Sequence, residues 1–305
     1  MKIKASDVIV PLDVPKAMRV EYVQNYLTST RESGRLLLFA GDQKAEHLNR
    51  DFIGGGIHPQ DSDPEHLFRI ASQARIGVFA TQPGLITRYG MDYPDVPYLV
   101  KLNAKTDLVT EADPVSQQWL DVKQVVDIRD NSGLKILAVG YSVYLGSVYE
   151  SIMLHQAAQI IFNAHQQGLL AVLWICLHGK AVKEKDERNP HMIAGAVGVG
   201  ACLGCDFVRV AYPTMDGAEP REIFKEATLA AGRTKVISSA GSSREIGAFL
   251  GNIHDQIHIS GAAGISVGRN IYQRSSDEAI KLCNAVHAVI IEGASVEDAL
   301  AHMLL

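Results

Sequence analysis

Cysteines are few and long apolar runs are missing, and both scarcities narrow the class of protein. Four cysteines occur in 305 residues, too few and too scattered for a disulfide framework, so we expect reduced thiols. No segment reaches the roughly 18 uninterrupted apolar residues that a membrane span requires. The first residues, MKIKASDVIVPLDVPK, interrupt their only short apolar run with Asp and Pro, unlike a secretion signal. We therefore predict a cytoplasmic protein with no membrane partner.

Positive charge is also in short supply. The 29 Lys and Arg residues are outnumbered by 34 Asp and Glu, which gives a formal net charge of -5. A nucleic-acid partner would require a basic surface, so we expect none, and any anionic ligand must be held by a local site. The hydrophobic content of 47% is that of an ordinary globular protein that buries a large core.

What the sequence does contain is a series of short, β-rich apolar runs separated by helix-like stretches. This alternation is typical of βα units and a parallel sheet, whose strands are buried on both faces. The runs are LLLFAGDQ from Leu36, IGVFATQ from Ile76, PYLVKLN from Pro97, KILAVGYSVY from Lys135, LLAVLWICL from Leu169, DFVRVAYP from Asp206, KVISSAG from Lys235 and AGISVGRN from Ala263.

Eight βα units predict an α/β fold, a closed (β/α)8 TIM barrel. A doubly wound open sheet is the alternative, but GDQKAEH after the first strand lacks the dinucleotide pattern G-x-G-x-x-G. We expect residues 1–305 to form a single domain, because no low-complexity linker divides them. Residues 1–30 should form a helical cap over the bottom of the barrel, and SVEDALAHML a final amphipathic helix.

In such barrels the functional residues lie at the carboxyl ends of the strands. Lys101, Asn103 and Lys105 share a strand face by period-two spacing. Lys101 stands inside an apolar run, where an unpartnered cation would cost several kcal/mol, which indicates a functional role. Asp42 ends the first strand and could be the counter-charge of Lys101, although a helix-capping Asp would look the same in sequence.

Three further strands carry polar side chains near their ends. Trp174, Cys176 and His178 share one face of the fifth strand, and Tyr144 and Arg209 lie on the fourth and sixth. Cys176 and His178 could form a thiolate and its base, yet residues two apart on a strand do not necessarily touch, and we do not favour this interpretation.

Small residues after the seventh and eighth strands predict a phosphate site. The first run is Ala240-Gly241-Ser242-Ser243-Arg244, and the second ends in Gly268 and Arg269. A glycine-rich turn alone is often only a tight connection. Two of them on these strands occupy the place where barrels commonly bind phosphate, and Arg269 adds a guanidinium that can fork onto phosphate oxygens. We therefore expect a small phosphorylated ligand.

Metal binding is not expected. Cys202 and Cys205 have C-x-x-C spacing, but no second pair completes a zinc site.

Taken together, these motifs resemble the archaeal-type class I fructose-bisphosphate aldolases, in the superfamily of deoxyribose-phosphate and tagatose-bisphosphate aldolases. The resemblance covers nearly the whole chain. It implies a cytosolic barrel without metal or other cofactor, a homo-oligomer of pentameric rings (pentamer or decamer), and cleavage of a ketose phosphate through a lysine Schiff base. The motifs are GDQKAEH, DYPDVPYLVKLNAKT, AVGYSVYLGS, AVLWICLHGKAV, GCDFVRVAYP, SSAGSSRE and GAAGISVGRNIYQR.

The sequence departs from this family where its catalytic groups should be. The Schiff-base lysine of the sixth strand is replaced by Arg209, whose guanidinium is not deprotonated in proteins and cannot act as an amine nucleophile. The acid/base tyrosine of the fifth strand is replaced by Cys176. By the same resemblance Asp42, Lys101, Asn103, Trp174 and the phosphate-site residues Gly241, Ser242, Ser243, Gly268 and Arg269 fit the family pattern.

Three functions are compatible with this pattern. The first is an aldolase-like lyase with relocated chemistry, in which Lys101 forms the imine near Arg209 while His178 or Tyr144 moves protons. The second is a catalytically inactive sugar-phosphate binder, a sensor or a partner subunit. The third is a different enzyme in the same pocket that acts by enolisation, with Asp42 or His178 as the base.

Overall fold

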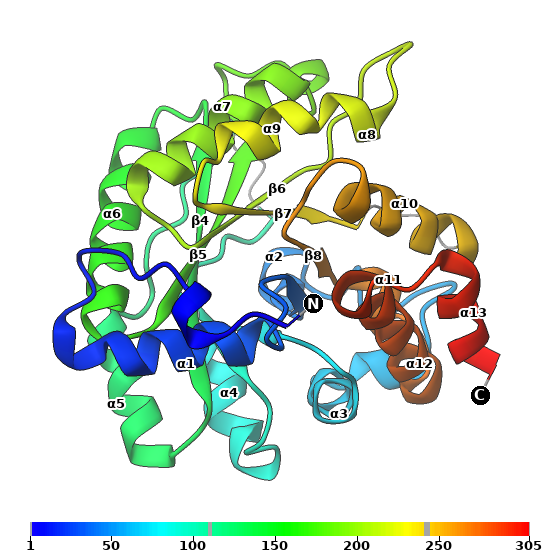
Figure 1. Cartoon of the computed structure of the whole chain (residues 1–305), viewed down its shortest axis with the longest axis horizontal. Helices are drawn as coiled ribbons and strands as arrows, with labels where there is room; N and C mark the ends of the chain where they lie inside the picture. The colour runs from blue at the N-terminus through cyan, green and yellow to red at the C-terminus, as the bar shows by residue number, and fades with distance from the viewer. Residues whose placement is uncertain (1, 109–111, 241–244, 305) are drawn as a thin grey trace.

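The computed structural model describes residues 2–108, 112–240 and 245–304. Eight parallel strands form a closed barrel in chain order, with β8 paired to β1. This confirms the predicted (β/α)8 architecture (Figure 1). The strands are β1 Leu36–Ala40, β2 Val78–Thr81, β3 Tyr98–Lys101, β4 Ile136–Leu145, β5 Leu170–Leu177, β6 Phe207–Val210, β7 Lys235–Ser239 and β8 Gly264–Val267.

Helices follow the strands and surround the barrel. The longer ones are α1 Arg19–Ser29, α3 Glu65–Gln73, α5 Val122–Ser132, α6 Glu150–Gln166, α7 Pro190–Leu203, α10 Ile246–His258, α12 Ser276–His287 and α13 Val296–Leu304. The shorter ones are α2 Gln43–Glu46, α4 Pro83–Tyr89, α8 Pro220–Ile223, α9 Lys225–Ala230 and α11 Arg269–Tyr272. Single turns are η1 Ala5–Asp7, η2 Lys16–Met18, η3 Pro59–Ser62, η4 Gly90–Asp92, η5 Glu184–Asp186 and η6 Ala288–Glu292. No helix in the described ranges is long and apolar enough to cross a membrane.

Side-chain alternation along the strands divides the core in two. On β1, Leu36 and Leu38 belong to the cluster that fills the barrel, whereas Leu37 and Phe39 pack outward against the helices. The inner cluster also contains Trp174 near its carboxyl end and Tyr22 of α1 near its amino end. The barrel interior is therefore a packed core that separates the two ends.

The glycine in the middle of β4 makes room for one of these inner side chains. A Cβ on Gly140 would lie 2.5 Å from Cζ3 of Trp174 and 2.7 Å from Cδ2 of Leu99. Any larger residue at position 140 would push the Trp174 indole out of its place. The glycine thus holds Trp174 where it meets the functional site.

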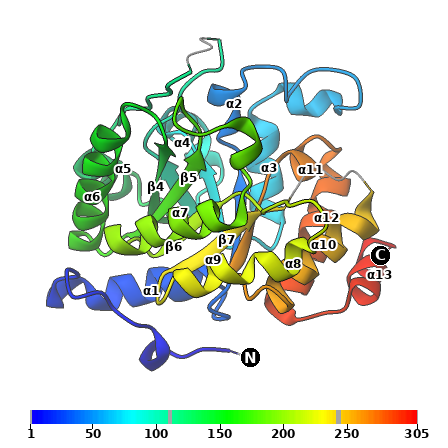
Figure 2. The same ribbon diagram turned by 90° about the horizontal axis from the view of Figure 1, so that it is seen from above.

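The two ends of the barrel carry different segments. Figure 2 shows α2, just after the carboxyl end of β1, on the opposite side of the barrel from α1 and the N-terminal segment. β3 is shorter than the sequence suggested, because it ends at Lys101. The prediction that Lys105 continues this strand was wrong: its Nζ donates to the carbonyl of neighbouring Thr106 in the following loop. Backbone geometry after β3 therefore removes Lys105 from the face of Lys101.

Candidate functional site

A cavity of about 440 Å³ opens at the carboxyl ends of the strands. Ser142 on β4, Trp174 on β5 and Arg209 on β6 are register neighbours across three adjacent strands. Their side chains therefore reach one wall of the cavity together. The cavity brings together seven of the predicted site residues: Asp42, Tyr144, Trp174, Cys176, His178, Arg209 and Arg269.

Lys101 lies beneath this cavity and is 0% exposed. Its Nζ donates to Oγ of Ser142 at 2.8 Å and to the carbonyl of Asn103 at 3.3 Å. The same ammonium lies 4.9 Å from the centre of the Trp174 ring, a cation–π contact. Every direction from the ammonium is thus occupied by protein, and Lys101 itself does not line the cavity.

Two carboxylates balance the charge of Lys101. Its Nζ is 3.4 Å from Oδ2 of Asp42 and 3.7 Å from Oε1 of Glu46. Asp42 occupies the position before α2, but its side chain accepts no capping hydrogen bond from the described backbone of that helix. The ion pair therefore supports the counter-charge interpretation of Asp42 over the capping one.

Glu46 is the site residue that sequence reasoning missed. It lines the cavity, and burial raises the pKa of its carboxyl above the ordinary value, while Lys101 works in the opposite direction. A carboxyl with a raised pKa is suited to exchanging protons near neutral pH. The available signal was its place one helical turn after Asp42, which puts both carboxyls near the same strand end.

Asn103 positions the polar layer beneath the cavity. Its side-chain amide donates to the carbonyls of Ser116 and Ser142, each at 3.0 Å, and its carbonyl oxygen accepts from the backbone N–H of Ser142 at 2.8 Å. All three side-chain bonds go to backbone groups. Asn103 thus fixes the chain on both sides of Ser142, which in turn holds Lys101.

Arg209 projects into the cavity from β6. Its Nε is buried and has no hydrogen-bond partner among the described residues. Burial raises the pKa of the Cys176 thiol, and the positive charges of Arg209 and Lys101 both lower it. Lys101 and Arg209 therefore belong to one electrostatic cluster. A buried guanidinium N–H without a partner is costly, and an anionic ligand would satisfy it.

Cys176 and Tyr144 are both in their neutral forms in this cluster. Burial raises the pKa of the Cys176 thiol and also that of the Tyr144 phenol. Neither is therefore activated as an anion at neutral pH. His178 does line the same cavity, but its Nδ1 is bonded to Oε1 of Glu187 at 2.7 Å. Among the described residues no hydrogen bond joins Cys176 to His178, which argues against a thiolate nucleophile.

The phosphate candidates are only partly within the described residues. Gly241, Ser242 and Ser243 lie outside them. A Cβ on Gly268 would lie 3.1 Å from the carbonyl oxygen of Ala40, so the close contact between the β8 and β1 ends favours glycine there. The Nε of Arg269 lies 3.7 Å from Oδ2 of Asp51, and its half-exposed guanidinium lines the cavity.

The two cysteines of the C-x-x-C motif have different environments. Cys202 is exposed and Cys205 is buried, with its thiol donating to the carbonyl of Gly200 at 3.3 Å. Among the residues that the structure describes, no group of three or more His, Cys, Asp or Glu side chains could hold a metal ion.

Fold and cavity together define an α/β barrel whose site lies at the carboxyl ends of its strands. The model of the DeoC/LacD family of aldolases matches residues 36–274. The chain belongs to this family.

Its relatives and structural neighbours include archaeal-type class I enzymes. A protein of Methanocaldococcus jannaschii, named fructose-bisphosphate aldolase/6-deoxy-5-ketofructose 1-phosphate synthase, is 56% identical over 299 residues, 98% of this chain and 95% of the relative. The structure of a fructose-bisphosphate aldolase from Slackia heliotrinireducens superimposes with a TM-score of 0.97 at 49% identity, covering 100% of this chain and 96% of that one. An archaeal fructose-1,6-bisphosphate aldolase with its catalytic Lys bound to a carbinolamine intermediate superimposes with a TM-score of 0.75 at 29% identity, covering 88% and 99%.

Proposed function

We propose that this chain binds a phosphorylated ketose at the carboxyl ends of its strands and holds it without forming an imine. The ligand class comes from the relatives, which are named as fructose-bisphosphate aldolases. The proposal that no imine forms depends on one observation: among the described residues that line the cavity there is no lysine, whereas Arg209 is one of them. A guanidinium stays protonated and can contact an anion, but it cannot attack a carbonyl carbon.

The surroundings of Lys101 support this proposal. An imine requires a neutral amine that reaches the substrate carbonyl. Lys101 is fully buried, its Nζ is paired with Asp42 and Glu46, and it does not line the cavity. Lys101 then acts as a positioning residue that holds Asp42 and Ser142 at the floor of the cavity.

The ligand would be held mainly through its phosphate groups. We assign one phosphate to the turns after β7 and β8, with Gly241, Ser242, Ser243, Gly268 and Arg269 as its contacts, the first three by position in the sequence. The unpartnered Nε of Arg209 offers a charge-assisted hydrogen bond to a second anionic group. Trp174 and Asp42 would contact the carbon chain and its hydroxyls. Asn103 supports them from below.

One observation favours a lyase as a second candidate. Asp42, Ser142 and Trp174 all contact Lys101 and all line the cavity, so the ammonium is one side chain away from a bound ketose. Release from its carboxylates would make Lys101 the imine-forming amine, with Glu46, Tyr144 or His178 as the proton carrier. Cys176 would replace the family tyrosine only as a neutral wall of the site.

The resemblance also supports two statements about the whole molecule. We propose that the chain works in the cytoplasm and assembles as a homo-oligomer, a pentamer or decamer. Light scattering of the purified protein tests the assembly.

Borohydride trapping separates the two candidate functions. The chain is incubated with fructose 1,6-bisphosphate or dihydroxyacetone phosphate, reduced, and mapped by mass spectrometry, while calorimetry measures binding. We expect saturable binding and no adduct in the wild type. In Arg209→Lys, which restores a primary amine at the β6 position, we expect an adduct on residue 209.

The other outcomes are equally informative. An adduct on Lys101 in the wild type, absent from Lys101→Met, would establish the lyase with relocated chemistry and reject our proposal. Absence of saturable binding in the wild type would reject both candidates.

A further inference from the structure

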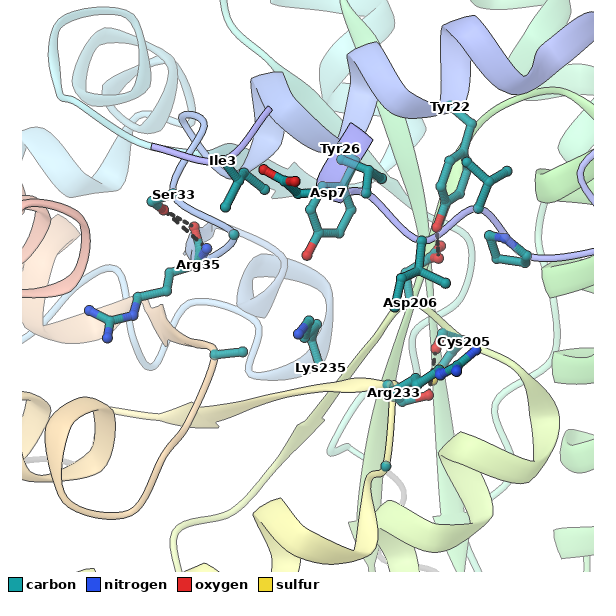
Figure 3. Close-up of a pocket in the computed structure, with 18 of the residues that line it drawn as sticks. Ile3, Asp7, Tyr22, Tyr26, Ser33, Arg35, Cys205, Asp206, Arg233 and Lys235 are labelled. Atoms are coloured by element: carbon teal, nitrogen blue, oxygen red, sulfur yellow. Dashed lines mark hydrogen bonds between the residues drawn. The ribbon is translucent and has the colours of Figure 1, made fainter. Parts of the chain in front are cut away.

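A second cavity lies at the opposite end of the barrel and is not part of the site described above. Its volume is about 890 Å³, and it is walled by the N-terminal segment, α1 and the amino ends of β1, β7 and β8. Figure 3 shows Ile3, Asp7 and Tyr26 on the side of the N-terminal segment and Lys235, Arg233 and Cys205 on the side of the barrel. The packed interior of the barrel separates this cavity from the one above Lys101.

The walls of this cavity carry an excess of positive charge. Arg35, Arg233 and Lys235 supply three cations. Among the described residues, Arg233 and Lys235 form no ion pair, and Arg35 donates only to the carbonyl of Ile290, at 2.9 Å. Burial lowers the pKa of the Arg35 guanidinium, and no carboxylate compensates for that burial. These cations therefore lack counter-charges of their own.

The two carboxylates in the walls are committed elsewhere. Asp206 accepts from the Tyr22 hydroxyl, from the backbone N–H of Ala171 at 2.7 Å and from Nε2 of His165 at 3.2 Å. Asp7 accepts from the backbone N–H of Lys4 at 2.8 Å. The three cations outnumber these two carboxylates, so the walls of the cavity carry a net positive charge.

Apolar and hydrogen-bonding groups complete the lining. Ile3, Ile9 and Ile257 supply apolar surface. The Tyr26 ring stacks on Phe207 with centroids 5.8 Å apart, and its hydroxyl has no hydrogen-bond partner within the described part of the chain. Burial raises the pKa of Tyr26 to about 12, so the hydroxyl remains a donor at neutral pH. The cavity combines cations, a free donor and apolar walls at a volume typical of small-molecule sites.

We propose that this cavity binds an organic phosphate of nucleotide size, with its phosphate on Lys235 and Arg233 and its apolar body against Ile3, Ile9 and the Tyr26 ring; Arg35 points away from these two side chains (Figure 3) and adds positive charge to the wall. The N-terminal segment forms one wall and the barrel the other. A ligand between them ties the segment to the barrel, because its two ends contact different walls. The proposal is independent of the function of the carboxyl-end cavity.

Calorimetric titration with adenosine monophosphate tests the proposal on the full-length protein. Lys235 and Arg233 are exposed at the cavity mouth, so the double variant Lys235→Gln/Arg233→Gln should fold normally. We expect saturable binding to the wild type and at least about tenfold weaker binding to the double variant, from the lost charge-assisted hydrogen bonds. Arg269→Gln, in the other cavity, is the matched control and should bind as the wild type does.

Two partial ligands, one without the phosphate and one without the apolar body, define the ligand class. Adenosine and inorganic phosphate should each bind more weakly than adenosine monophosphate, since each lacks one half of the contacts. Hydrogen exchange should slow at residues 3–12 when the nucleotide is bound. The proposal is overturned if the wild type shows no saturable binding, if Arg269→Gln rather than the double variant loses it, or if inorganic phosphate binds as tightly as the nucleotide.

Discussion

Each end of the barrel has a buried cation between two carboxylates, and the two clusters differ in how completely they are satisfied. At the amino end His165 lies between Asp13, at 2.8 Å, and Asp206, at 3.2 Å. Both oxygens of Asp206 accept hydrogen bonds, one from Tyr22 and the other from His165 and a backbone N–H. At the carboxyl end Lys101 lies between Asp42 and Glu46, yet Oδ1 of Asp42 and Nε of Arg209 are buried without a partner among the described residues.

This difference separates a cluster whose buried polar atoms are satisfied within the protein from one that, in the function we propose, is completed by a ligand. Buried polar groups are normally hydrogen-bonded, and those that are not call for an explanation. The amino-end cluster joins the N-terminal segment, α6 and the start of β6, and among the described residues none of its buried side-chain nitrogen and oxygen atoms lacks a partner. The carboxyl-end cluster leaves donors and acceptors facing a cavity, which costs stability that a bound sugar phosphate would restore.

The largest effect on stability is expected from the amino-end cluster. Asp206→Ala removes the partner of Tyr22, Ala171 and His165 and leaves the buried imidazolium with only one of its two carboxylates, the part-exposed Asp13. The free energy of unfolding should fall by about 3–5 kcal/mol, measured by denaturant titration. The control is Asp7→Ala, which removes an exposed carboxylate of the N-terminal segment. It should change the free energy of unfolding by less than about 1 kcal/mol.

The same titration tests the domain organisation. We propose that residues 1–305 form one domain in which residues 1–30 are a capping segment. Fluorescence and far-ultraviolet circular dichroism should then report a single coincident transition. A separate early transition that is unaffected by Asp206→Ala would contradict both the capping role and the importance of the cluster.

An intermediate effect is expected from pH. Burial alone would lower the pKa of His165, but hydrogen bonds and the charges of Asp206 and Asp13 outweigh it and raise this pKa to about 9. Because the pKa of His165 is higher in the folded state, its contribution to the free energy of unfolding is fully present below about pH 6.5, the ordinary histidine pKa. This contribution is lost as the pH rises through about 9. The free energy of unfolding should therefore decrease by an amount on the order of 2 kcal/mol between pH 7 and pH 10.

His165→Gln supplies the matched comparison. This variant should be less stable than the wild type at pH 7, and its unfolding free energy should vary less over the same pH interval. An equal slope in both proteins would assign the titration to other groups and remove His165 from the argument.

The smallest effect on stability is expected at the carboxyl end. Arg209→Met replaces a partly buried guanidinium with an unpartnered Nε by an apolar chain of similar length, so the unfolding free energy should stay within about 1 kcal/mol of the wild type or rise. Binding of the phosphorylated ketose should nevertheless weaken by about tenfold or more. A large loss of stability together with unchanged ketose binding would reverse the comparison between the two ends.

Much of the fold could be predicted because strand burial leaves a strong pattern. All eight apolar runs became strands, and the closed barrel followed from their number. Strand ends were harder to place: the apparent alternation through Lys105 continued past the true end of β3 at Lys101. The alternation of residue types can continue past the end of a strand, because it does not show where the backbone stops pairing with the neighbouring strands.

The candidate site was predictable in its chemistry but not in its partners. Lys101 was identifiable because a cation in an apolar run requires compensation, and Asp42 because it ends another buried strand of the barrel. Glu46 was not, because only the turn of α2 brings its carboxyl within 3.7 Å of Lys101. Likewise only the structure shows that His178 bonds through Nδ1 to Glu187, whereas no hydrogen bond joins it to Cys176 among the described residues.

The sequence by itself determined the barrel, its family and the presence of an arginine, Arg209, on β6, because these depend on periodicity and on the identity of single residues. Only the tertiary structure decided that Lys101 is enclosed by two carboxylates, a serine and an indole, and that Arg209 faces the cavity with an unpartnered nitrogen. Solvation and ion pairing depend on distances between strands far apart in the chain. Those distances are fixed when the barrel closes, and they decide which charged groups are satisfied by the protein and which remain for a ligand.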